Sequence, residues 1–512
     1  MKSSQKIVLN TAATYTRSVI AVALSLFSSR WIFNGLGQTD YGIFSVVGSL
    51  IIFIFFFNNL MAHSAGRHYA FAIGQGDTEE VNRWFNTAVS IHLCFAVILT
   101  IIGWPIGEYF IANILNIPAE RLATSLSVYR VSLIAAFIGV IAVPFTAMFT
   151  AKQRITELAV WSLLQTLLIF ILAWCLNYVT GDKLLFYAIC MVAIILFVQL
   201  IQISRAISVF NECKIDREKW FDKKRTGEIF SFAGWNLIGN LGGVLRDQGT
   251  AILLNLFFGP KVNAAYGIAN QVSNQTTQLS GAMMGAFMPE ITSSEGRGDR
   301  QRMLDLSLRA CKLGTILIVI FAVPLIIEMD YVLKLWLINP PMHAALFCQL
   351  ILFTFLIDRL SGGYMLAVHA HGKIAAYQAT VGTVLVLTLP LAWLFLKIGF
   401  SPPSVGIAFV ITMVIIALGR VYWVRRLFDV PVKIWFMSVL IPVSVVTIAS
   451  AIGALIPRLF LSASLMRLLG AVIISLCLNS LTAWFFALDF KERTFIKQSI
   501  KQVSNKLKDL VV

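Results

Sequence analysis

The dominant pattern of the chain is a series of long apolar runs separated by short polar connections. A helix needs about 20 mostly apolar residues to cross the hydrocarbon core of a bilayer. Because the runs are continuously apolar rather than alternating, they exclude a transmembrane β-barrel. They predict an all-α polytopic membrane protein with about 14 transmembrane helices, at about 8–33, 41–62, 84–112, 122–150, 156–178, 184–207, 229–257, 262–292, 304–327, 343–368, 374–396, 405–424, 434–456 and 465–487.

The composition agrees with a membrane protein and excludes an ordinary soluble enzyme. Charged residues make up 13% and hydrophobic residues 58% of the 512 positions, whereas soluble domains average about 25% and 45–50%. The net charge of +16 by itself suggests a nucleic-acid partner. However, 27 of the 41 lysines and arginines lie on one side of the predicted topology, in its loops and tails or, for Arg205 and Arg420, at the span ends that lead into them. Such loops face the cytoplasm, so we expect cytoplasmic N- and C-termini and no nucleic-acid partner.

Two short motifs recur along the chain and predict an internal duplication. The sequence Tyr-Gly-Ile at 41–43 returns at 266–268, and a Gly-x-Gly-Asp sequence at 74–77 returns at 296–299. The two offsets are nearly equal, at 225 and 222 positions. The Asp that ends each Gly-x-Gly-Asp sequence can cap the following helix, and Glu80 is placed to complete a capping box in the first copy.

The duplication predicts the arrangement of the spans. Six spans separate the matched motifs, so both halves begin on the same side of the membrane and the repeat is parallel, with a pseudo-two-fold axis along the membrane normal. Two lobes around a central cleft are typical of alternating access. The predicted parts are an N-lobe of six spans (1–207), a charged cytoplasmic interlobe loop (208–228), a C-lobe of six spans (229–424), two extra C-terminal spans (425–490) and a basic cytoplasmic tail (491–512).

Cationic residues inside the spans mark a candidate binding site, because a charge at the centre of a membrane helix costs about 2.5–3.5 kcal/mol. The alternatives are ion pairs between helices and snorkelling to the interface. Spans one to six contain no carboxylate at mid-membrane depth, so a cavity lined by these cations would attract a phosphate or diphosphate and repel organic cations. The candidates are Arg17, Arg30, Arg130, Arg246 and Arg359.

Other polar residues at membrane depth extend the candidate site. Asp247 follows Arg246 and Asp358 precedes Arg359 in the sequence, and both aspartates are candidates for ion coupling. Neighbouring residues on a helix project about 100° apart, so Arg246 and Asp247 should not both face one partner. Lipid cannot satisfy the amides of span eight, which must face a wet cavity or other helices. These amides are Asn270, Gln271, Asn274 and Gln278. Cysteine and histidine spacings fit no metal site, and we expect no metal and no cofactor.

Several stretches resemble the polysaccharide flippase (Wzx-type) branch of the multidrug/oligosaccharidyl-lipid/polysaccharide exporter superfamily. They are Asn-Thr-Ala-Ala-Thr-Tyr-Thr-Arg at 10–17, Gly-Leu-Gly-Gln-Thr-Asp-Tyr-Gly at 35–42, and Met-Pro-Glu-Ile at 288–291 followed by 296–299. The resemblance covers essentially the whole chain. Members of this branch serve the synthesis of O-antigen and lipopolysaccharide, capsule or exopolysaccharide.

The resemblance implies that the chain flips an undecaprenyl-diphosphate-linked oligosaccharide across the bacterial inner membrane by alternating access. It implies that cations of the central cavity bind the substrate, which fits Arg17, Arg30 and Arg246 better than Arg130 and Arg359. Na⁺, H⁺ or the membrane potential would drive the cycle. The expected partners are the lipid-linked oligosaccharide, membrane lipids, and the polysaccharide polymerase or chain-length machinery.

Three other functions compete with this interpretation. A multidrug cation antiporter has the same architecture but needs a buried carboxylate in the N-lobe, and Asp40 lies too near the outer interface to supply it. A membrane glycosyltransferase or polymerase needs acid/base or metal-binding carboxylates on a large outer loop, whereas the largest predicted outer connection is the short segment 328–342. A non-transporting assembly scaffold would be insensitive to replacement of the arginines.

Overall fold

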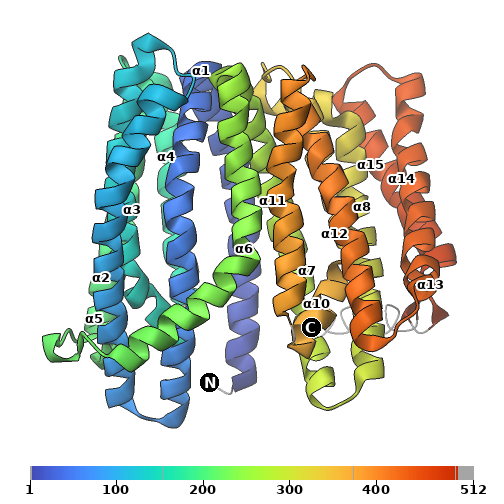
Figure 1. The fold of residues 1–512 in the computed structure, drawn as a ribbon. Coiled ribbons are helices and arrows are strands. Elements are labelled where there is room, and N and C mark those ends of the chain that lie inside the picture. The colour runs from blue at the N-terminus through green and yellow to red at the C-terminus, as the bar shows by residue number, and fades with distance from the viewer. Residues whose placement is uncertain (1–2, 153, 373, 491, 494–512) are drawn as a thin grey trace, which may run out of the picture. The chain divides into compact units, whose positions relative to one another are not determined.

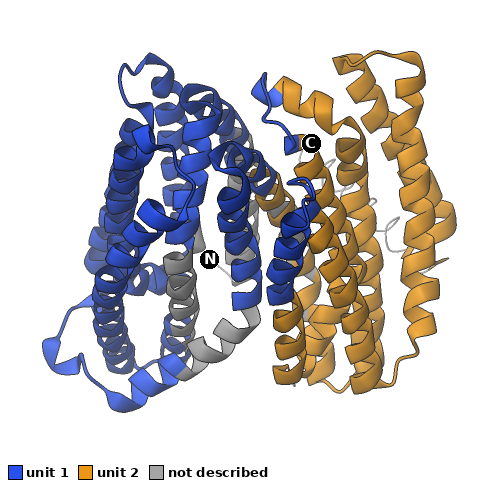
Figure 2. Ribbon diagram, turned by 45° about the horizontal axis from the view of Figure 1, so that its top comes forward, with its two compact units in different colours: residues 1–270, 336–344, 385–405 blue, residues 271–335, 345–384, 406–512 orange. Residues whose placement is uncertain are grey.

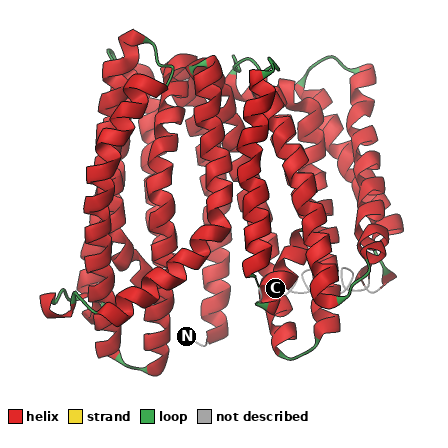
Figure 3. Ribbon diagram, in the orientation of Figure 1, coloured by secondary structure: helices red, strands yellow, loops and turns green. Residues whose placement is uncertain are grey.

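The computed structural model describes residues 3–152, 154–372, 374–490 and 492–493, which are almost entirely helical and include no strand (Figure 3). The α-helices are α1 (Ser3–Gln75), α2 (Thr78–Tyr109), α3 (Ala119–Ala151), α4 (Ile155–Cys175), α5 (Lys183–Val209), α6 (Lys223–Phe258), α7 (Pro260–Gly296), α8 (Arg300–Leu337), α9 (Ala344–Leu360), α10 (Gly362–His371), α11 (Ala375–Lys397), α12 (Ser404–Phe428), α13 (Val432–Trp435), α14 (Ile441–Phe460) and α15 (Leu465–Thr482). Short 3-10 or π-helical turns lie at Phe110–Ile114, Leu176–Tyr178, Asn211–Cys213, Arg217–Lys219, Phe436–Leu440 and Ala483–Ala487.

The helices confirm an all-α polytopic membrane protein. Within the described residues, nine helices are long and apolar enough to cross a membrane, and the bent pair α9–α10 makes a tenth. The other predicted spans lie in α1, α6 and α7. Helix α1 contains two of them, because Gly37 interrupts its 73 residues with a φ of 76° and a ψ of 172°. Helices α6 and α7 are less apolar because glycines and amide side chains occur among their apolar residues.

The chain forms two compact units, which Figure 2 shows in different colours. The first unit comprises 1–270, 336–344 and 385–405, and the second comprises 271–335, 345–384 and 406–512. The main boundary therefore falls inside α7 rather than in the interlobe loop, because α6 and the start of α7 pack against α1. The predicted lobes follow the sequence repeat and stay a prediction.

The first unit has two apolar clusters, one toward each end of its helices. The distal end is the one where α1 turns at Gly37, and the proximal end is the one where α1 ends and α2 begins. The first half of α6 runs obliquely to the other helices of this unit (Figure 1). The distal cluster includes Ile43, Ile111, Tyr129, Leu133, Leu176 and Tyr187. The proximal cluster includes Tyr69, Phe85, Phe145, Met148, Phe149 and Phe210.

The second unit attaches the two extra C-terminal helices to α8 through one buried carboxylate. Glu328 of α8 is fully buried and accepts hydrogen bonds from Arg458 of α14, at 3.0 Å, and Arg467 of α15, at 2.6 Å. The apolar core of this unit brings together α7, α8, α10, α12 and the C-terminal helices, through residues such as Met284, Cys311, Tyr364, Val421, Trp435 and Val443. Removing either arginine would leave part of the buried negative charge without its counter-ion.

Repeated sequences adopt repeated backbone conformations. Gly37 and Gly259, which lie 222 positions apart, have the same φ of 76° and extended ψ values, and Gly76 and Gly298 have φ values of 76° and 77°. Only glycine adopts these conformations without strain. The predicted helix caps are also present. Asp77 accepts a hydrogen bond from the Glu80 N–H at 2.9 Å, and Asp299 accepts one from the Arg302 N–H at 3.1 Å.

The capping box predicted for Glu80 is wrong in one respect. The Glu80 carboxylate does not return to the start of its own helix. It accepts hydrogen bonds from the Arg225 guanidinium group at 2.7, 3.0 and 3.2 Å. A long-range ion pair to α6 replaces the local contact, because several charge-assisted hydrogen bonds from one guanidinium group are stronger than one bond to a backbone N–H.

Candidate functional site

Arg246 and Asp247 of α6 form an ion pair with each other. Arg246 Nε lies 2.7 Å from Asp247 Oδ1, although the two residues are adjacent in the sequence. The long arginine side chain reaches across the angle that separates neighbouring positions on a helix. The side chain of Asp247 is 40% exposed and that of Arg246 is 18% exposed. The pair is therefore neutral overall and accessible from one side, so an incoming anion can compete with Asp247 for the guanidinium group.

Arg30 of α1 is half-buried and has no ion-pair partner among the described residues. One turn earlier, the Leu26 carbonyl oxygen accepts a hydrogen bond from Trp336 Nε1 at 2.7 Å. This contact anchors the segment of α1 that carries Arg30. Arg17 lies outside the side chains that the structure describes, so its assignment to the cavity stays a prediction.

Arg130 of α3 forms an ion pair with Glu108 of α2, with 2.5 Å between Nε and Oε1. Its side chain is 46% exposed, so this pair lies at the periphery of two neighbouring helices. Glu108 lies near the end of its predicted span. From the sequence alone it was therefore not expected to reach Arg130. Arg130 thus forms an ion pair between two helices, which is one of the alternatives to substrate binding, and its charge is already paired with that of Glu108.

Arg359 belongs to a buried charge cluster in the second unit that the sequence reveals only in part. Asp358 Oδ2 lies 3.0 Å from Arg359 Nη2, and Asp358 Oδ1 lies 2.7 Å from Arg420 Nη1 of α12. No local feature of the sequence marks Arg420, because it lies five and six residues before Arg425 and Arg426, near the end of its span, and fits the basic flank expected there. The cluster of two arginines and one aspartate has a net charge of +1.

The charge cluster lies at a break in the tenth predicted span. Helices α9 and α10 are bent by 47° at Ser361. A break frees backbone carbonyl groups that the helix would otherwise satisfy. Here Arg420 Nη1 donates to the Asp358 carbonyl oxygen at 3.1 Å, and Trp435 Nε1 donates to the Leu360 carbonyl oxygen at 2.8 Å. A Cβ atom at Gly363 would overlap the Ser307 carbonyl oxygen, so the start of α10 packs directly on α8.

The amides of α7 follow the predicted polar stripe in part. Asn270 and Gln271 are half-buried and Asn274 is exposed, whereas Gln278 lies outside the described side chains. The buried Thr276 hydroxyl group donates a hydrogen bond within its own helix, to the Val272 carbonyl oxygen at 2.9 Å. Since lipid offers an exposed amide no partner, the position of Asn274 favours a wet surface. The role of the stripe as a cavity wall stays a prediction.

The repeated Tyr-Gly-Ile motifs meet at the distal end of the first unit. A Cβ atom at Gly42 would overlap the Pro260 carbonyl oxygen, and one at Gly267 would lie 3.0 Å from Ser45 Oγ and 3.2 Å from the Tyr41 ring. The two glycines thus allow the part of α1 that follows Gly37 and the start of α7 to approach each other closely. We call this contact the distal joint.

An amide contact continues the distal joint. Asn255 Oδ1, which is fully buried, accepts a hydrogen bond from the Asn116 N–H at 2.7 Å, and Asn255 Nδ2 donates to the Asn116 carbonyl oxygen at 3.5 Å. The sequence identified the motifs as a repeat, but it gave no signal that the two copies touch.

Comparison with protein families gives a match over more than half of the chain. A family model described as "Polysaccharide biosynthesis protein" matches residues 10–295. The uncharacterized membrane protein EpsK of Bacillus subtilis (strain 168) is 23% identical over 323 residues. That alignment covers 61% of this chain and 62% of EpsK, so the chain spans less than two thirds of the length of this relative.

Solved structures show which fold the chain shares. The lipid II flippase MurJ in an inward closed conformation superposes with a TM-score of 0.67 and 12% identity, over 93% of this chain and 99% of that one. A multidrug resistance MATE family transporter of the MOP superfamily, in an inward-facing conformation, gives a TM-score of 0.62 and 15% identity, over 80% of this chain and 94% of that one. At these identities the likeness concerns the fold alone.

Proposed function

Because the chain belongs to the polysaccharide biosynthesis protein family, we propose that it flips an undecaprenyl-diphosphate-linked oligosaccharide across the bacterial inner membrane by alternating access. The family match over 10–295 is the observation that carries the proposal. The fold shared with MOP-superfamily transporters supplies an architecture on which such transport can operate. With cytoplasmic termini, as the charge distribution predicts, the distal joint faces the outside and closes that end of the first unit.

In this mechanism Arg246 binds the diphosphate. The guanidinium group is held by Asp247 on the same helix, and that pair is accessible from one side. A diphosphate that links a lipid to a sugar carries two negative charges, against one for a carboxylate, and can make paired, charge-assisted hydrogen bonds to the arginine fork. Arg30, which has no ion-pair partner among the described residues, adds a second positive charge in the same unit. On the basis of its position in the first predicted span, Arg17 is proposed as a third cation that binds the substrate.

Exchange of partners at Arg246 provides a route to ion coupling. When the diphosphate replaces Asp247 on the guanidinium group, the carboxylate loses its counter-ion and can take up a proton or Na⁺. Release of the substrate on the outer side restores the pair and expels the ion there, so substrate and ion move outward together. An inside-negative membrane potential favours this movement because the diphosphate carries two negative charges, whereas an inward-directed ion gradient opposes it. The membrane potential acts on the same charges. A polymerase or chain-length protein would receive the flipped oligosaccharide.

The proposal is tested by reconstituting the purified protein into vesicles that contain lipid-linked oligosaccharide extracted from the source cells. Appearance of the glycan on the opposite leaflet is measured with an externally added lectin. We expect the protein to accelerate this appearance and to leave the distribution of ethidium, an organic cation, unchanged. Ethidium transport without glycan movement would contradict the proposal in favour of a multidrug antiporter. Parallel vesicles with a Na⁺ gradient, a pH gradient or a membrane potential identify the driving force.

A further inference from the structure

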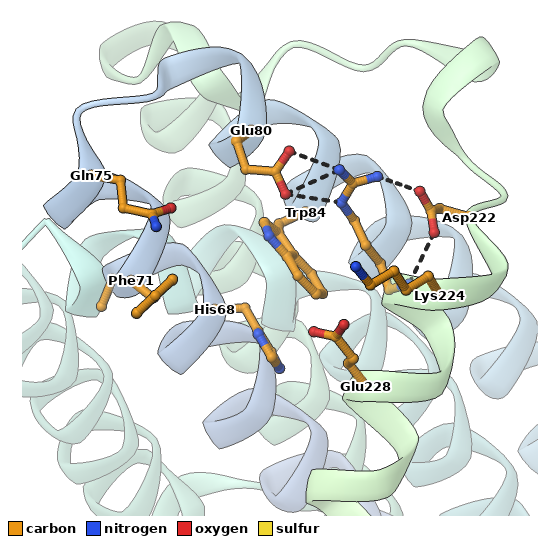
Figure 4. Close-up of a pocket in the computed structure, with 10 residues that line it drawn as sticks. His68, Phe71, Gln75, Glu80, Trp84, Asp222, Lys224 and Glu228 are labelled. Carbon is orange, nitrogen blue, oxygen red and sulfur yellow. Dashed lines mark hydrogen bonds and ion pairs between the residues drawn. The ribbon is translucent and has the colours of Figure 1, made fainter.

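The proximal end of the first unit contains a cavity of about 670 Å³ that the proposed transport mechanism does not use (Figure 4). It lies between the end of α1, the start of α2 and the start of α6. Figure 4 shows His68 from α1, Trp84 from α2 and Glu228 from α6 around the same space. A cavity of this volume is within the range of small-molecule binding sites.

One wall of the cavity is held rigid by stacked rings and ion pairs. The Trp84 ring stacks on His68 with 4.2 Å between the ring centroids and 12° between the planes, and the Arg225 guanidinium carbon lies 5.6 Å from the Trp84 ring. Arg225 is bound on its other side by Glu80 and Asp222. Asp222 also caps α6 by accepting a hydrogen bond from the Arg225 N–H at 2.9 Å, which holds the pKa of this carboxyl group below its usual range.

Four other side chains at the cavity are exposed and take part in none of these ring stacks or ion pairs among the described residues. Phe71 is 68% exposed. Gln75, Lys224 and Glu228 are exposed and make no hydrogen bond or ion pair through their side chains with the described residues. A ligand would therefore meet one aromatic face, one amide, one ammonium group and one carboxylate, all without displacing an existing contact.

The charges of the cavity disfavour a phosphate. Glu80, Asp222 and Glu228 supply three negative charges against two positive charges from Lys224 and Arg225. Arg225 is already neutralised by two of the carboxylates. The site thus differs from Arg246, whose described carboxylate partner, Asp247, is 40% exposed and can be exchanged.

We propose that this cavity binds the sugar residues of the substrate, as an entry site for the glycan part of the lipid-linked oligosaccharide. The inference rests on the proposed function. Sugar hydroxyl groups both donate and accept hydrogen bonds, so Glu228, Gln75 and Lys224 can all bind them. The apolar C–H face of a sugar ring packs on an aromatic ring, and Phe71 offers such a ring.

The location of the cavity suits this role. With the predicted topology it opens toward the cytoplasm, where the lipid-linked glycan is presented. It shares α6 with Arg246, which lies 21 positions beyond Arg225. The glycan and the diphosphate would therefore bind to different parts of one helix, with hydroxyl-binding groups at its start and a cation further along.

The test uses the oligosaccharide released from its carrier by mild acid, which contains neither lipid nor diphosphate. Binding to the full-length protein in detergent is measured by saturation-transfer NMR and titration. We expect the wild-type protein to bind this probe, and Phe71→Ala and Glu228→Gln each to weaken binding about three- to tenfold, as loss of one aromatic or charged contact does. Phe221→Ala is the matched control, because Phe221 is 84% exposed, precedes the same helix and does not line the cavity.

Absence of binding to the wild-type protein, or equal affinity of the Phe71 and Phe221 variants, would overturn the inference. Displacement of the probe by glycerophosphoethanolamine at equal concentration would also overturn it, since the cavity would then prefer a phospholipid headgroup. The vesicle assay separates the two proposals. Flipping of the lipid-linked oligosaccharide without binding of the released glycan refutes only the entry site, whereas glycan binding without flipping refutes the proposed function.

Discussion

Two charge clusters at membrane depth, one in each unit, differ in their burial and in their freedom to change partners. Arg246 and Asp247 form a neutral pair of neighbours, with the aspartate side chain 40% exposed. In the second unit, the side chains of Asp358 and Arg420 are 15% and 8% exposed, and Arg420 also donates to the carbonyl oxygen of Asp358 at the α9–α10 break. The first cluster pairs two adjacent residues of one helix. The second links α9 to α12 and also satisfies a main-chain carbonyl group at the helix break.

The difference shows why an arginine inside a membrane span is not sufficient to mark a substrate site. A buried pair that also satisfies backbone groups cannot release its partner without exposing several polar groups at once. A pair whose carboxylate is exposed, as that of Asp247 is, can exchange one anion for another at smaller cost. We therefore propose that Arg246 binds the substrate, whereas Arg420 positions the helix break and Arg359 is held in the same cluster by Asp358.

The largest effect is expected for Asp358→Asn. This change leaves Arg359 and Arg420 buried without their shared counter-ion, which costs about 3–5 kcal/mol. Thermal unfolding of the purified variant in detergent, followed by tryptophan fluorescence, should show a large decrease in Tm. Asp247→Asn is the matched control, because its more exposed pair contributes about 1 kcal/mol or less. Equal melting temperatures of the two variants would remove the distinction between the clusters.

An intermediate effect is expected for Arg420→Lys. Lysine keeps the positive charge but cannot donate to both the carboxylate and the main-chain oxygen of Asp358 with the geometry of a guanidinium fork. The resulting unsatisfied carbonyl group should lower the unfolding free energy by about 1–3 kcal/mol. Arg246→Lys, measured in the same way, should change stability by less than half as much. A reversed order would mean that Arg246 is the structural residue.

The smallest effect on stability is expected for Asp247→Asn, and its main effect should be on coupling. The variant should fold and insert normally but lose the dependence of glycan flipping on the coupling gradient, because an amide takes up neither a proton nor Na⁺. Initial flipping rates in vesicles with imposed pH or Na⁺ gradients measure this dependence. A gradient response equal to that of the wild-type protein would exclude Asp247 as the coupling group.

Much of the fold could be predicted from the sequence because its signals are local. Apolar runs predict the spans, and the Gly-x-Gly-Asp motifs predict the caps at Asp77 and Asp299, which depend on residues only three positions apart. The two spans in α6 and α7 were predicted in spite of their polar residues, because their length and low charge still fit a membrane helix.

The charge clusters could be predicted only in part, because their contacts join distant positions. Arg420 pairs with a residue 62 positions away, and Arg225 pairs with Glu80 from 145 positions away. Nothing local distinguishes Arg420 from the basic residues that usually flank a span. Arg130 looked like a cavity cation for the same reason, since its partner Glu108 is on another helix. Only packing decides which of these charges are satisfied.

Arg246 is the proposed binding site for the diphosphate of the lipid-linked oligosaccharide. This role is tested most directly by the initial rate of lectin-accessible glycan appearance in vesicles that contain equal amounts of wild-type, Arg246→Lys or Arg246→Ala protein, each with a melting temperature measured beforehand. We predict that Arg246→Ala reduces the rate at least about tenfold, corresponding to loss of a charge-assisted contact of about 1.5–3 kcal/mol, and that Arg246→Lys retains an intermediate rate. A wild-type rate of flipping by correctly inserted, stable Arg246→Ala protein would show that Arg246 does not bind the diphosphate.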